Sequence, residues 1–307
     1  MNPVSRFVRL ASLLVSEALA PRTLQRIPEP AVVMEDPERV RAFHDQGDPS
    51  TGPLLPVYHL NAVATSRLMP LGGRLLDGGS GSGRNLIYLA RCRQDIRITG
   101  LDMSGEMVSL GNAEIRKAGL EDRVRLVVGD MTDLEAGVQD RVDVVSSIFA
   151  FHHLPRREAL HQCLESMARL VDRFGCAVWS FDHARPRLRW TADIFPGIFT
   201  PESPDFFNRD STNSLKASFS FEELSASFDA CFPGRTVAHA RSKLLRLYQV
   251  HWMPGKRSGS IADPSRELNE DRLPADARKA YRSLQWLFRS TPLIRGAPPS
   301  AASQEAP

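Results

Sequence analysis

The residues best placed to do chemistry form a glycine-rich segment after a short apolar run. Leu75 and Leu76 lead into the sequence Asp77-Gly78-Gly79-Ser80-Gly81-Ser82-Gly83. Glycine lets the backbone approach a ligand closely and adopt positive φ. The helix expected to begin at Arg84 would direct unpaired N–H groups toward the negative end of a ligand. We therefore expect this segment to bind a small polar cofactor.

Three further features follow the glycine-rich segment in an order that suits a nucleoside. Asp102 ends the next expected strand, 19 residues beyond Gly83, and a carboxylate there can accept hydrogen bonds from both ribose hydroxyls. Asp130 comes just after the third expected strand, and residues 142–148 form a fourth that leads into Phe151-His152-His153-Leu154. Because ligands bind at the carboxyl ends of parallel strands, these residues should gather at one edge of the sheet.

With these motifs, residues 70–185 resemble the class I S-adenosylmethionine (AdoMet) dependent methyltransferases, whose first motif is Asp-x-Gly-x-Gly-x-Gly. The match begins at Asp77, and Gly78 stands where the family usually has an apolar residue. The resemblance implies AdoMet as the cofactor. It also implies which residues bind the methionine part, the ribose, the adenine and the region near the transferable methyl group. The methionine part would be bound by Asp77, Gly78, Gly79, Gly81 and Gly83, and the ribose by Asp102. The adenine would be bound by Asp130 with Met103 and Met131, and the region near the methyl group would be lined by Ile148 and Phe149.

Other families with a glycine loop fit less well. The dinucleotide fingerprint Gly-x-Gly-x-x-Gly is not met, because its last position is Arg84 when read from Gly79 and Leu86 when read from Gly81. A phosphate-binding loop would need Gly-Lys-Ser/Thr, which the segment lacks. A non-catalytic AdoMet-fold binding protein is a further alternative, although the intact glycine loop and both carboxylates argue against it.

Three histidines on the expected ligand side of the sheet are the candidate catalytic residues: His152, His153 and His183. The sulfonium of AdoMet already activates the methyl group, so a general base is needed only when the acceptor must lose a proton. Histidine titrates near neutral pH and suits that role. The alternative is that His152 and His153 are structural parts of their turn and that His183 is an exposed loop residue. His44 and Tyr58 are weaker candidates.

The residues after the fourth expected strand indicate the type of acceptor. Amino-directed nucleic-acid methyltransferases of this fold carry Asn/Asp-Pro-Pro-Tyr/Phe there, whereas this chain reads Ser147-Ile148-Phe149-Ala150. Neither Cys163 nor Cys176 has the setting of a cytosine C5 nucleophile. The acidic cluster of metal-dependent catechol-type enzymes is not visible. We therefore expect a small organic acceptor, methylated on O, N or C without a metal.

An RNA or protein acceptor is the main alternative. It would need a substrate surface, which a C-terminal helix could offer through interleaved basic and aromatic residues: Arg278, Lys279, Arg282 and Arg289 with Tyr281, Trp286 and Phe288. Such a stripe is more often a partly solvated face whose aromatic rings pack on the domain. The formal net charge of +3 over 307 residues gives no general reason to expect nucleic-acid binding.

The composition, with 42% hydrophobic and 24% charged residues, is ordinary for a globular protein. The four cysteines lack the spacing of metal ligands, which disfavours zinc and disulfides and favours a reduced, cytoplasmic protein. Residues 1–20 predict an amphipathic helix rather than a signal peptide, because Glu17 interrupts a short apolar run. No stretch reaches the roughly 18 apolar residues of a membrane span.

Strand-like and helix-like segments alternate from residue 74 onward, which predicts a doubly wound, mostly parallel, seven-stranded α/β sheet of the class I methyltransferase type. We expect a helical N-terminal cap over residues 1–70, the AdoMet-binding domain over 71–255, and a C-terminal helix with a disordered tail over 256–307. Residues 184–219 are predicted to be an irregular lid beside the transferable methyl group. Its aromatic residues are Trp190, Phe195, Phe199, Phe206 and Phe207.

Overall fold

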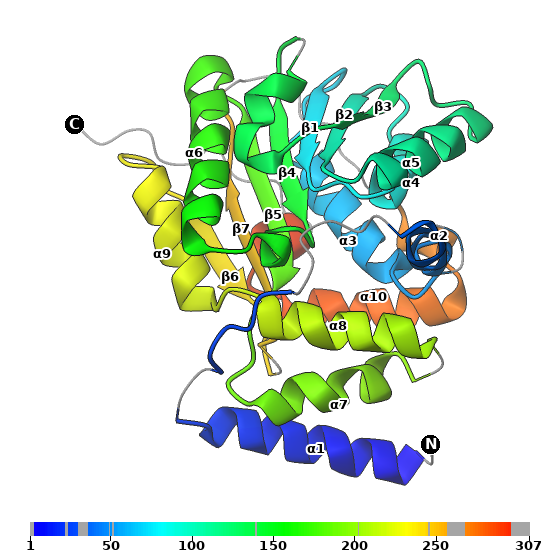
Figure 1. Cartoon of the computed structure of the whole chain (residues 1–307), viewed down its shortest axis with the longest axis vertical. Coiled ribbons are helices and arrows are strands. Elements are labelled where there is room, and N and C mark those ends of the chain that lie inside the picture. The colour runs from blue at the N-terminus through cyan, green and yellow to red at the C-terminus, as the bar shows by residue number, and fades with distance from the viewer. Residues whose placement is uncertain are drawn as a thin grey trace.

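The computed structural model describes residues 3–21, 24–29, 36–48, 50, 52–138, 140–201, 203–244, 246–256 and 268–295. Figure 1 shows a central sheet with helices on both faces and a stack of further helices at one end. The predicted disordered tail, from residue 296 onward, lies outside the described residues.

The sheet has seven strands within the described residues, in the order β3-β2-β1-β4-β5-β7-β6. Strands β1 to β5 pair in parallel, and β7 is antiparallel to both β5 and β6, which confirms the predicted sheet. Strand order reverses between β1 and β4, the switch point where α/β sheets bind ligands. The strands are β1 (Arg74–Gly78), β2 (Arg97–Asp102), β3 (Val124–Val128), β4 (Val144–Ile148), β5 (Ala177–His183), β6 (Ala238–Arg241) and β7 (Tyr248–Met253).

Alternating side chains of the central strands divide the apolar core between the two faces of the sheet. Leu75 and Val144 belong to one core, whereas their neighbours Leu76 and Val145 belong to the other. Successive residues of a strand point to opposite faces, so a sheet covered on both sides needs a continuous apolar run. The covering helices are α3 (Leu55–Ser66), α4 (Arg84–Cys92), α5 (Gly105–Lys117) and α10 (Ala275–Leu287) on one face, and α6 (Arg157–Phe174) and α9 (Phe221–Cys231) on the other.

At one end of the sheet, the helices α8 (Asp205–Ala217), α7 (Arg189–Phe199) and α1 (Pro3–Leu19) stack in that order (Figure 1). The buried carboxylate of Glu17 joins α1 to α7. It accepts hydrogen bonds from the backbone N–H groups of Arg187 and Leu188 and from the Thr191 hydroxyl. Glu17 thus supplies a negative charge at the N-terminus of α7, where the helix dipole favours one.

The prediction that residues 184–219 are irregular is wrong, because this segment contains α7 and α8. Its aromatic residues also serve different purposes. The Phe195 ring packs against Phe199 and Tyr248, while the Phe207 ring packs against Phe43. Phe43 lies on α2 (Pro37–Gln46), so α8 contacts α2 through these two rings.

The C-terminal helix α10 uses its polar side chains locally. Arg278 and Arg282 form ion pairs with Asp271 and Glu270, respectively, and the ring of Tyr281 is buried. The remaining elements are the short helices η1 (Met131–Gly137), η2 (Phe151–His153), η3 (Glu270–Arg272) and α11 (Pro292–Arg295). Among the described residues, none of the helices has the length and apolar character that a membrane crossing requires.

Candidate active site

The loop after β1 contains three glycines with left-handed backbone. The φ angles of Gly79, Gly81 and Gly83 are 74°, 54° and 68°, a conformation that costs other residues roughly 1–2 kcal/mol. Gly81 lines a cavity, and a Cβ added to it would meet no heavy atom within 4 Å. A Cβ on Gly79 would lie 2.3 Å from the Ala150 Cβ. The loop therefore presents bare backbone to the cavity and lies directly against the segment after β4.

Gly78 stands where the Asp-x-Gly-x-Gly-x-Gly motif usually has an apolar residue, and the packing around it explains the difference. A Cβ at this position would lie 2.8 Å from a methyl carbon of Leu134, which is fully buried on η1. The Leu134 side chain thus occupies the space beside Gly78 that a larger residue would need. Gly78 supports the loop from behind and is not among the residues that line the cavity.

Asp102, at the end of β2, ties the glycine loop to the next helix. One carboxylate oxygen accepts a hydrogen bond from the Gly81 N–H at 2.6 Å, and the other accepts one from the Ser104 N–H at 2.9 Å. Burial raises the pKa of Asp102 against the effect of these bonds. Each carboxylate oxygen can accept a further hydrogen bond, and Asp102 lines the cavity. Its position fits the ribose diol that the resemblance assigns to it.

Asp77 has a different environment from Asp102. It is buried at the switch point between β1 and β4, where the Ser146 hydroxyl donates a hydrogen bond to it. Burial raises its pKa to about 7. Asp77 is not among the cavity-lining residues, so its hydrogen bond joins two strands beneath the site.

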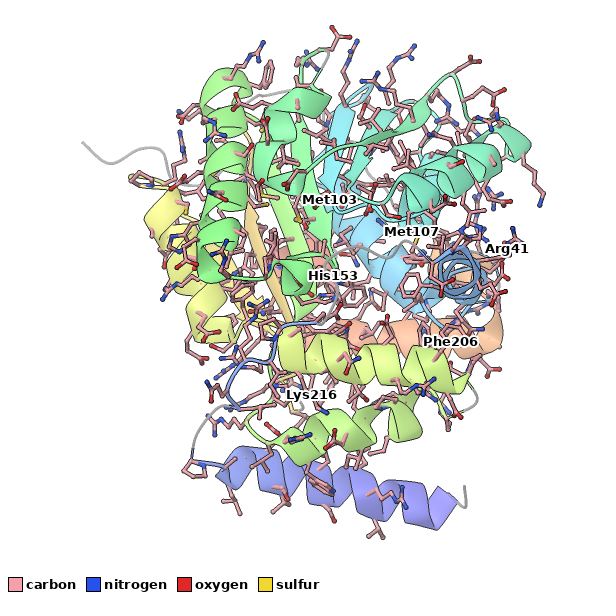
Figure 2. All side chains as sticks on the ribbon, viewed as in Figure 1. Arg41, Met103, Met107, His153, Phe206 and Lys216 are labelled. Carbon is pink, nitrogen blue, oxygen red and sulfur yellow. The ribbon has the colours of Figure 1, made fainter. Side chains whose placement is uncertain are left out.

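The loop opens onto a cavity of about 460 Å³, a size typical of small-molecule sites. Figure 2 labels Met103 and Met107, from the start of α5 and the residues just before it, and His153, at the end of η2, all of which line this cavity. The expected site residues that line it are Gly79, Gly81, Asp102, Met103, Met131, Ile148, Phe149 and His153. Those not among its lining residues are Asp77, Gly78, Gly83, Asp130, His152 and His183.

Phe149, directly after β4, has a strained backbone at the cavity wall. Its φ is 55°, which is unusual for a residue with a bulky side chain. Its ring stacks on His183 with centroids 4.6 Å apart and meets the edge of Phe181 at 5.1 Å. These contacts fix the left-handed turn that brings Ile148, Phe149 and Ala150 to the cavity.

His152 is held by Asp182 beneath the cavity. Its Nδ1 lies 2.7 Å from one carboxylate oxygen, and its backbone N–H donates to the other at 3.1 Å. Burial raises the pKa of Asp182, but the charge and hydrogen bond of His152 outweigh that effect and lower it. His152 therefore anchors the turn after β4 to the end of β5.

His183 is a packed ring rather than a loop residue facing solvent. It packs against both Phe149 and Tyr248, with centroids 4.6 and 5.3 Å away, and those two rings also lie 6.2 Å from each other. Burial lowers its pKa to about 3, so the ring is neutral at physiological pH. The His183 ring therefore helps to hold the Phe149 side chain in place.

His153 faces the cavity and has a carboxylate partner. Its Nδ1 lies 2.8 Å from Glu29 Oε2, and its side chain is 39% exposed. Burial lowers the pKa of His153, but the hydrogen bond and charge of Glu29 outweigh that effect and raise it. Burial likewise opposes the ionisation of Glu29, yet the hydrogen bond from His153 brings its pKa down to about 2. The pair is therefore arranged as an imidazole oriented by an ionised carboxylate.

Glu29 was not predicted from the sequence, since the Pro-Glu-Pro segment that contains it indicates only a break between helices. It lies 124 positions before His153, so no local spacing connects the two. Several other unpredicted cavity residues lie on α2, α3 or α8, or directly before α2 and α3. They include Asp36, Phe43, Leu54, Asp210 and Asn213, together with the weak candidates His44 and Tyr58. Of the two helices in the 184–219 segment, α8 lines the cavity and α7 does not.

Glu29, His152 and His153 have ligand atoms within 4.8 Å of one another, as a metal site would require. In the described structure these side chains already have hydrogen-bond partners, because Asp182 binds Nδ1 of His152 and Glu29 binds Nδ1 of His153. A metal bound through Nδ1 of His153 would replace its hydrogen bond to Glu29. The expected independence from metal stays a prediction, and chelation tests it directly.

Comparisons with known proteins agree with this geometry. Residues 75–175 match the family model described as a methyltransferase domain. The 27-O-demethylrifamycin SV methyltransferase of Amycolatopsis mediterranei is 35% identical over 92 residues, which cover 29% of this chain and 33% of that protein. The ubiquinone biosynthesis O-methyltransferase of Xanthomonas axonopodis is 28% identical over 122 residues, covering 38% of this chain and 49% of that protein. The matches span only a third to a half of the length of these curated relatives.

Solved structures extend the likeness beyond the matched segment. The plantazolicin methyltransferase BpumL, solved with a desmethylplantazolicin analogue and S-adenosylhomocysteine (SAH), aligns with a TM-score of 0.53. Its sequence is 14% identical, and the alignment covers 81% of this chain and 99% of that one. The plantazolicin methyltransferase BamL aligns with a TM-score of 0.51 and 15% identity, covering 80% of this chain and 84% of that one. At these identities the likeness concerns the fold.

The sheet order, the bare glycine loop, the carboxylate at the end of β2 and the family match over residues 75–175 all point to the same conclusion. The chain carries a class I methyltransferase domain, and its cofactor is S-adenosyl-L-methionine.

Proposed function

We propose that this chain transfers the methyl group of AdoMet to a hydroxyl group of a small organic acceptor, without a metal. The observation that carries the proposal is the pair of His153 and Glu29 at the wall of the cavity that also contains the glycine loop. A hydroxyl is the acceptor that gains most from such a pair, because it must lose its proton as the methyl is transferred. Among the matched relatives, the ubiquinone biosynthesis and erythromycin 3''-O-methyltransferases are O-methyltransferases by name.

Cofactor binding is assigned to the glycine loop and Asp102. Bound AdoMet supplies a methyl group already activated by the sulfonium. Gly79 and Gly81 leave room for the methionine part, and Asp102 accepts hydrogen bonds from the ribose hydroxyls. Met103, Met107 and Met131 give an apolar surface to the adenine. These residues do no bond chemistry, and their contribution is to hold the methyl in line with the acceptor.

His153 is assigned the role of general base. Glu29 holds Nδ1, so Nε2 is the ring nitrogen left to accept the hydroxyl proton. The negative charge of Glu29 then balances the imidazolium that forms, as the carboxylate does in a catalytic triad. Because the base must be neutral to accept a proton, turnover should rise with pH through the raised pKa of His153.

The rest of the cavity suits a small molecule with an apolar body. Phe43, Leu54 and Leu154 supply apolar wall, and Asp210 and Asn213 supply polar groups. Small-molecule sites combine a concave apolar surface with a few placed polar groups in this way. The basic residues of α10 offer less support for an RNA acceptor, because Arg278 and Arg282 are paired with acids.

The test is an incubation of the chain with AdoMet and hydroxylated acceptors that include 27-O-demethylrifamycin SV, with and without EDTA. Mass spectrometry would measure SAH and the methylated product. We expect the product to be a methyl ether, formed in equal amounts with and without EDTA. A methylated amine or carbon as the product, loss of turnover with EDTA, or methylation of added RNA or protein instead would overturn it.

A further inference from the structure

A short segment without helix or strand, residues 24–29, carries Glu29 to His153. It crosses between two neighbouring parts of the fold. The Leu24 N–H donates a hydrogen bond to the Pro186 carbonyl at 3.2 Å, and the Ile27 N–H donates one to the Lys216 carbonyl at 3.0 Å. This segment is therefore fixed on the loop after β5 and on the last turn of α8 before it reaches the cavity.

Arg26, in the middle of this segment, binds the turn that holds His153. Its guanidinium donates hydrogen bonds to the carbonyl oxygens of His152 at 3.1 Å, Leu154 at 2.5 Å and Pro155 at 3.0 Å. Its Nε donates to the Ala217 carbonyl at 2.5 Å, and its plane lies 4.0 Å from the centroid of the Phe219 ring. One side chain thus joins the residues on both sides of His153 to the end of α8.

The carbonyl groups that Arg26 binds need a partner. η2 is a three-residue turn, and the last carbonyl groups of any helix have no partner within it. Leu154 and Pro155 come after η2, and the next helix begins only at Arg157, so their carbonyl groups lie between two helices. Arg26 stabilises these carbonyl groups from another part of the chain. Its contacts are therefore specific to the turn rather than a general surface ion pair.

We propose that Arg26 is a positioning residue that assembles the His153–Glu29 pair by joining the turn after β4 to the segment that carries Glu29. This inference rests on the proposed function only in giving the pair a catalytic use. Arg26 does not line the cavity, so it acts through His153 and Glu29 and not on the acceptor. When it is lost, Glu29 should leave His153 while AdoMet binding at Asp102 stays intact.

Lysine cannot replace arginine in this arrangement. The four hydrogen bonds of Arg26 leave from three nitrogens in one plane, whereas a lysine has a single nitrogen with three donors. Lysine also lacks the flat group that stacks on Phe219. Arg26→Lys therefore keeps the positive charge and removes the geometry, which separates positioning from a simple electrostatic effect.

The ionisation of His153 reports its contact with Glu29 directly. Several other charged or titratable groups surround this imidazole, and Arg26→Lys replaces none of them: His152, Asp182, His183, Asp210 and Asp102. Glu29 provides the hydrogen bond and the leading charge that raise the pKa of His153. Removal of Glu29 from the ring should therefore lower that pKa, even in the absence of AdoMet and acceptor.

The experiment is an NMR titration of His153 in the full chain, with its signals assigned by their absence in His153→Ala. Glu29→Gln defines the lower limit of the pKa. We expect Arg26→Lys to shift the pKa of His153 down toward that limit, and Arg26→Lys to add no further shift in a Glu29→Gln background. Phe219→Leu, which removes only the stacking surface, should give a smaller shift in the same direction if Arg26→Lys does not fold.

Arg187→Lys is the matched control. The Arg187 guanidinium also donates to carbonyl groups of the N-terminal segment, those of Ala18 and Ala20, but to none in the turn of His153. It should leave the pKa of His153 unchanged. A folded Arg26→Lys, or a folded Phe219→Leu in its place, with the wild-type pKa would overturn the inference. A lowered pKa without any effect on turnover would instead count against His153 as the base and leave the positioning role intact.

Discussion

The two sides of the cavity are built in different ways. The cofactor side comes from strand ends that follow one another along the chain, with Gly79, Gly81 and Asp102 held by backbone geometry and short-range hydrogen bonds. The proposed acceptor side is assembled from distant segments, with Glu29 beside His153 across 124 positions and α8 lining the cavity. The first side belongs to the segment that matches the methyltransferase domain, residues 75–175, whereas the second also needs residues 24–29 and α8.

This difference predicts that changes on the two sides should have separate effects. Variants of the cofactor side should lose AdoMet binding, and variants of the acceptor side should lose turnover while binding AdoMet normally.

The largest effect is expected from Gly81→Val. A β-branched side chain would enter the cavity and resist the positive φ, so we expect calorimetry to detect no AdoMet binding. Gly119→Val is the control, because Gly119 also has positive φ and open space around its Cβ position but lies outside the cavity. Both variants should lose similar stability. Equal AdoMet affinity in both would show that the glycine loop is not the binding site.

His153→Ala should lower kcat by about 10²- to 10⁴-fold, the range for loss of a general base. The affinity for AdoMet should stay within a few fold of wild type, because the cofactor contacts lie on the other side. His161→Ala serves as control, since the His161 ring lies outside the cavity, where it hydrogen-bonds with Ser227. Loss of AdoMet affinity with preserved kcat would contradict the division between the two sides.

Asp102→Ala should weaken AdoMet binding by about 1.5–3 kcal/mol, the contribution of hydrogen bonds to a charged group. This corresponds to about 10- to 150-fold in Kd. Asp130→Ala makes the comparison sharper, because Asp130 caps η1 and is not among the cavity-lining residues. Its variant should bind AdoMet within a few fold of wild type. If calorimetry instead shows a larger loss of AdoMet affinity for Asp130→Ala than for Asp102→Ala, then Asp130 contacts the adenine, as the resemblance implies.

The smallest effect is a change in pH dependence. Glu29 holds the pKa of His153 above its usual value, and only neutral His153 can accept a proton. In Glu29→Gln that pKa falls, so the acid limb of the kcat profile should move to lower pH. Glu38→Gln, an exposed change on the same cap, should leave the profile in place. An acid limb that moves to higher pH in Glu29→Gln would show that another group controls it.

The sequence predicted the sheet and most of the cofactor side because those features depend on neighbouring residues. The spacing of Gly79, Gly81 and Asp102 follows from one strand–loop–strand unit, and apolar runs mark each strand. Neighbouring residues do not explain Gly78. Glycine is needed there because the Leu134 side chain, on η1, fills the space that a Cβ would occupy. The acceptor side could not be predicted, because the partners of Glu29 and Arg26 lie more than 100 positions away.

The failure to predict the helices of residues 184–219 has a more local cause. Pro196, Gly197 and Pro204 indicate breaks when taken singly. In the structure Pro196 lies near the end of α7 and Pro204 immediately precedes α8. Asp205 in the first turn of α8 is a helix-start signal, because an acid suits the helix dipole, and Pro204 before it ends any preceding helix. That signal was present in the sequence and could have identified α8.

The measurement that tests the central claim most directly is a crystal structure of the chain with bound SAH. We expect the ribose hydroxyls on Asp102, the methionine part over Gly79 and Gly81, and the sulfur directed toward His153, with Glu29 still on its Nδ1. A cofactor bound with its sulfur away from His153, or a His153 that has turned out of the cavity and lost Glu29, would contradict the account that both sides form one active site.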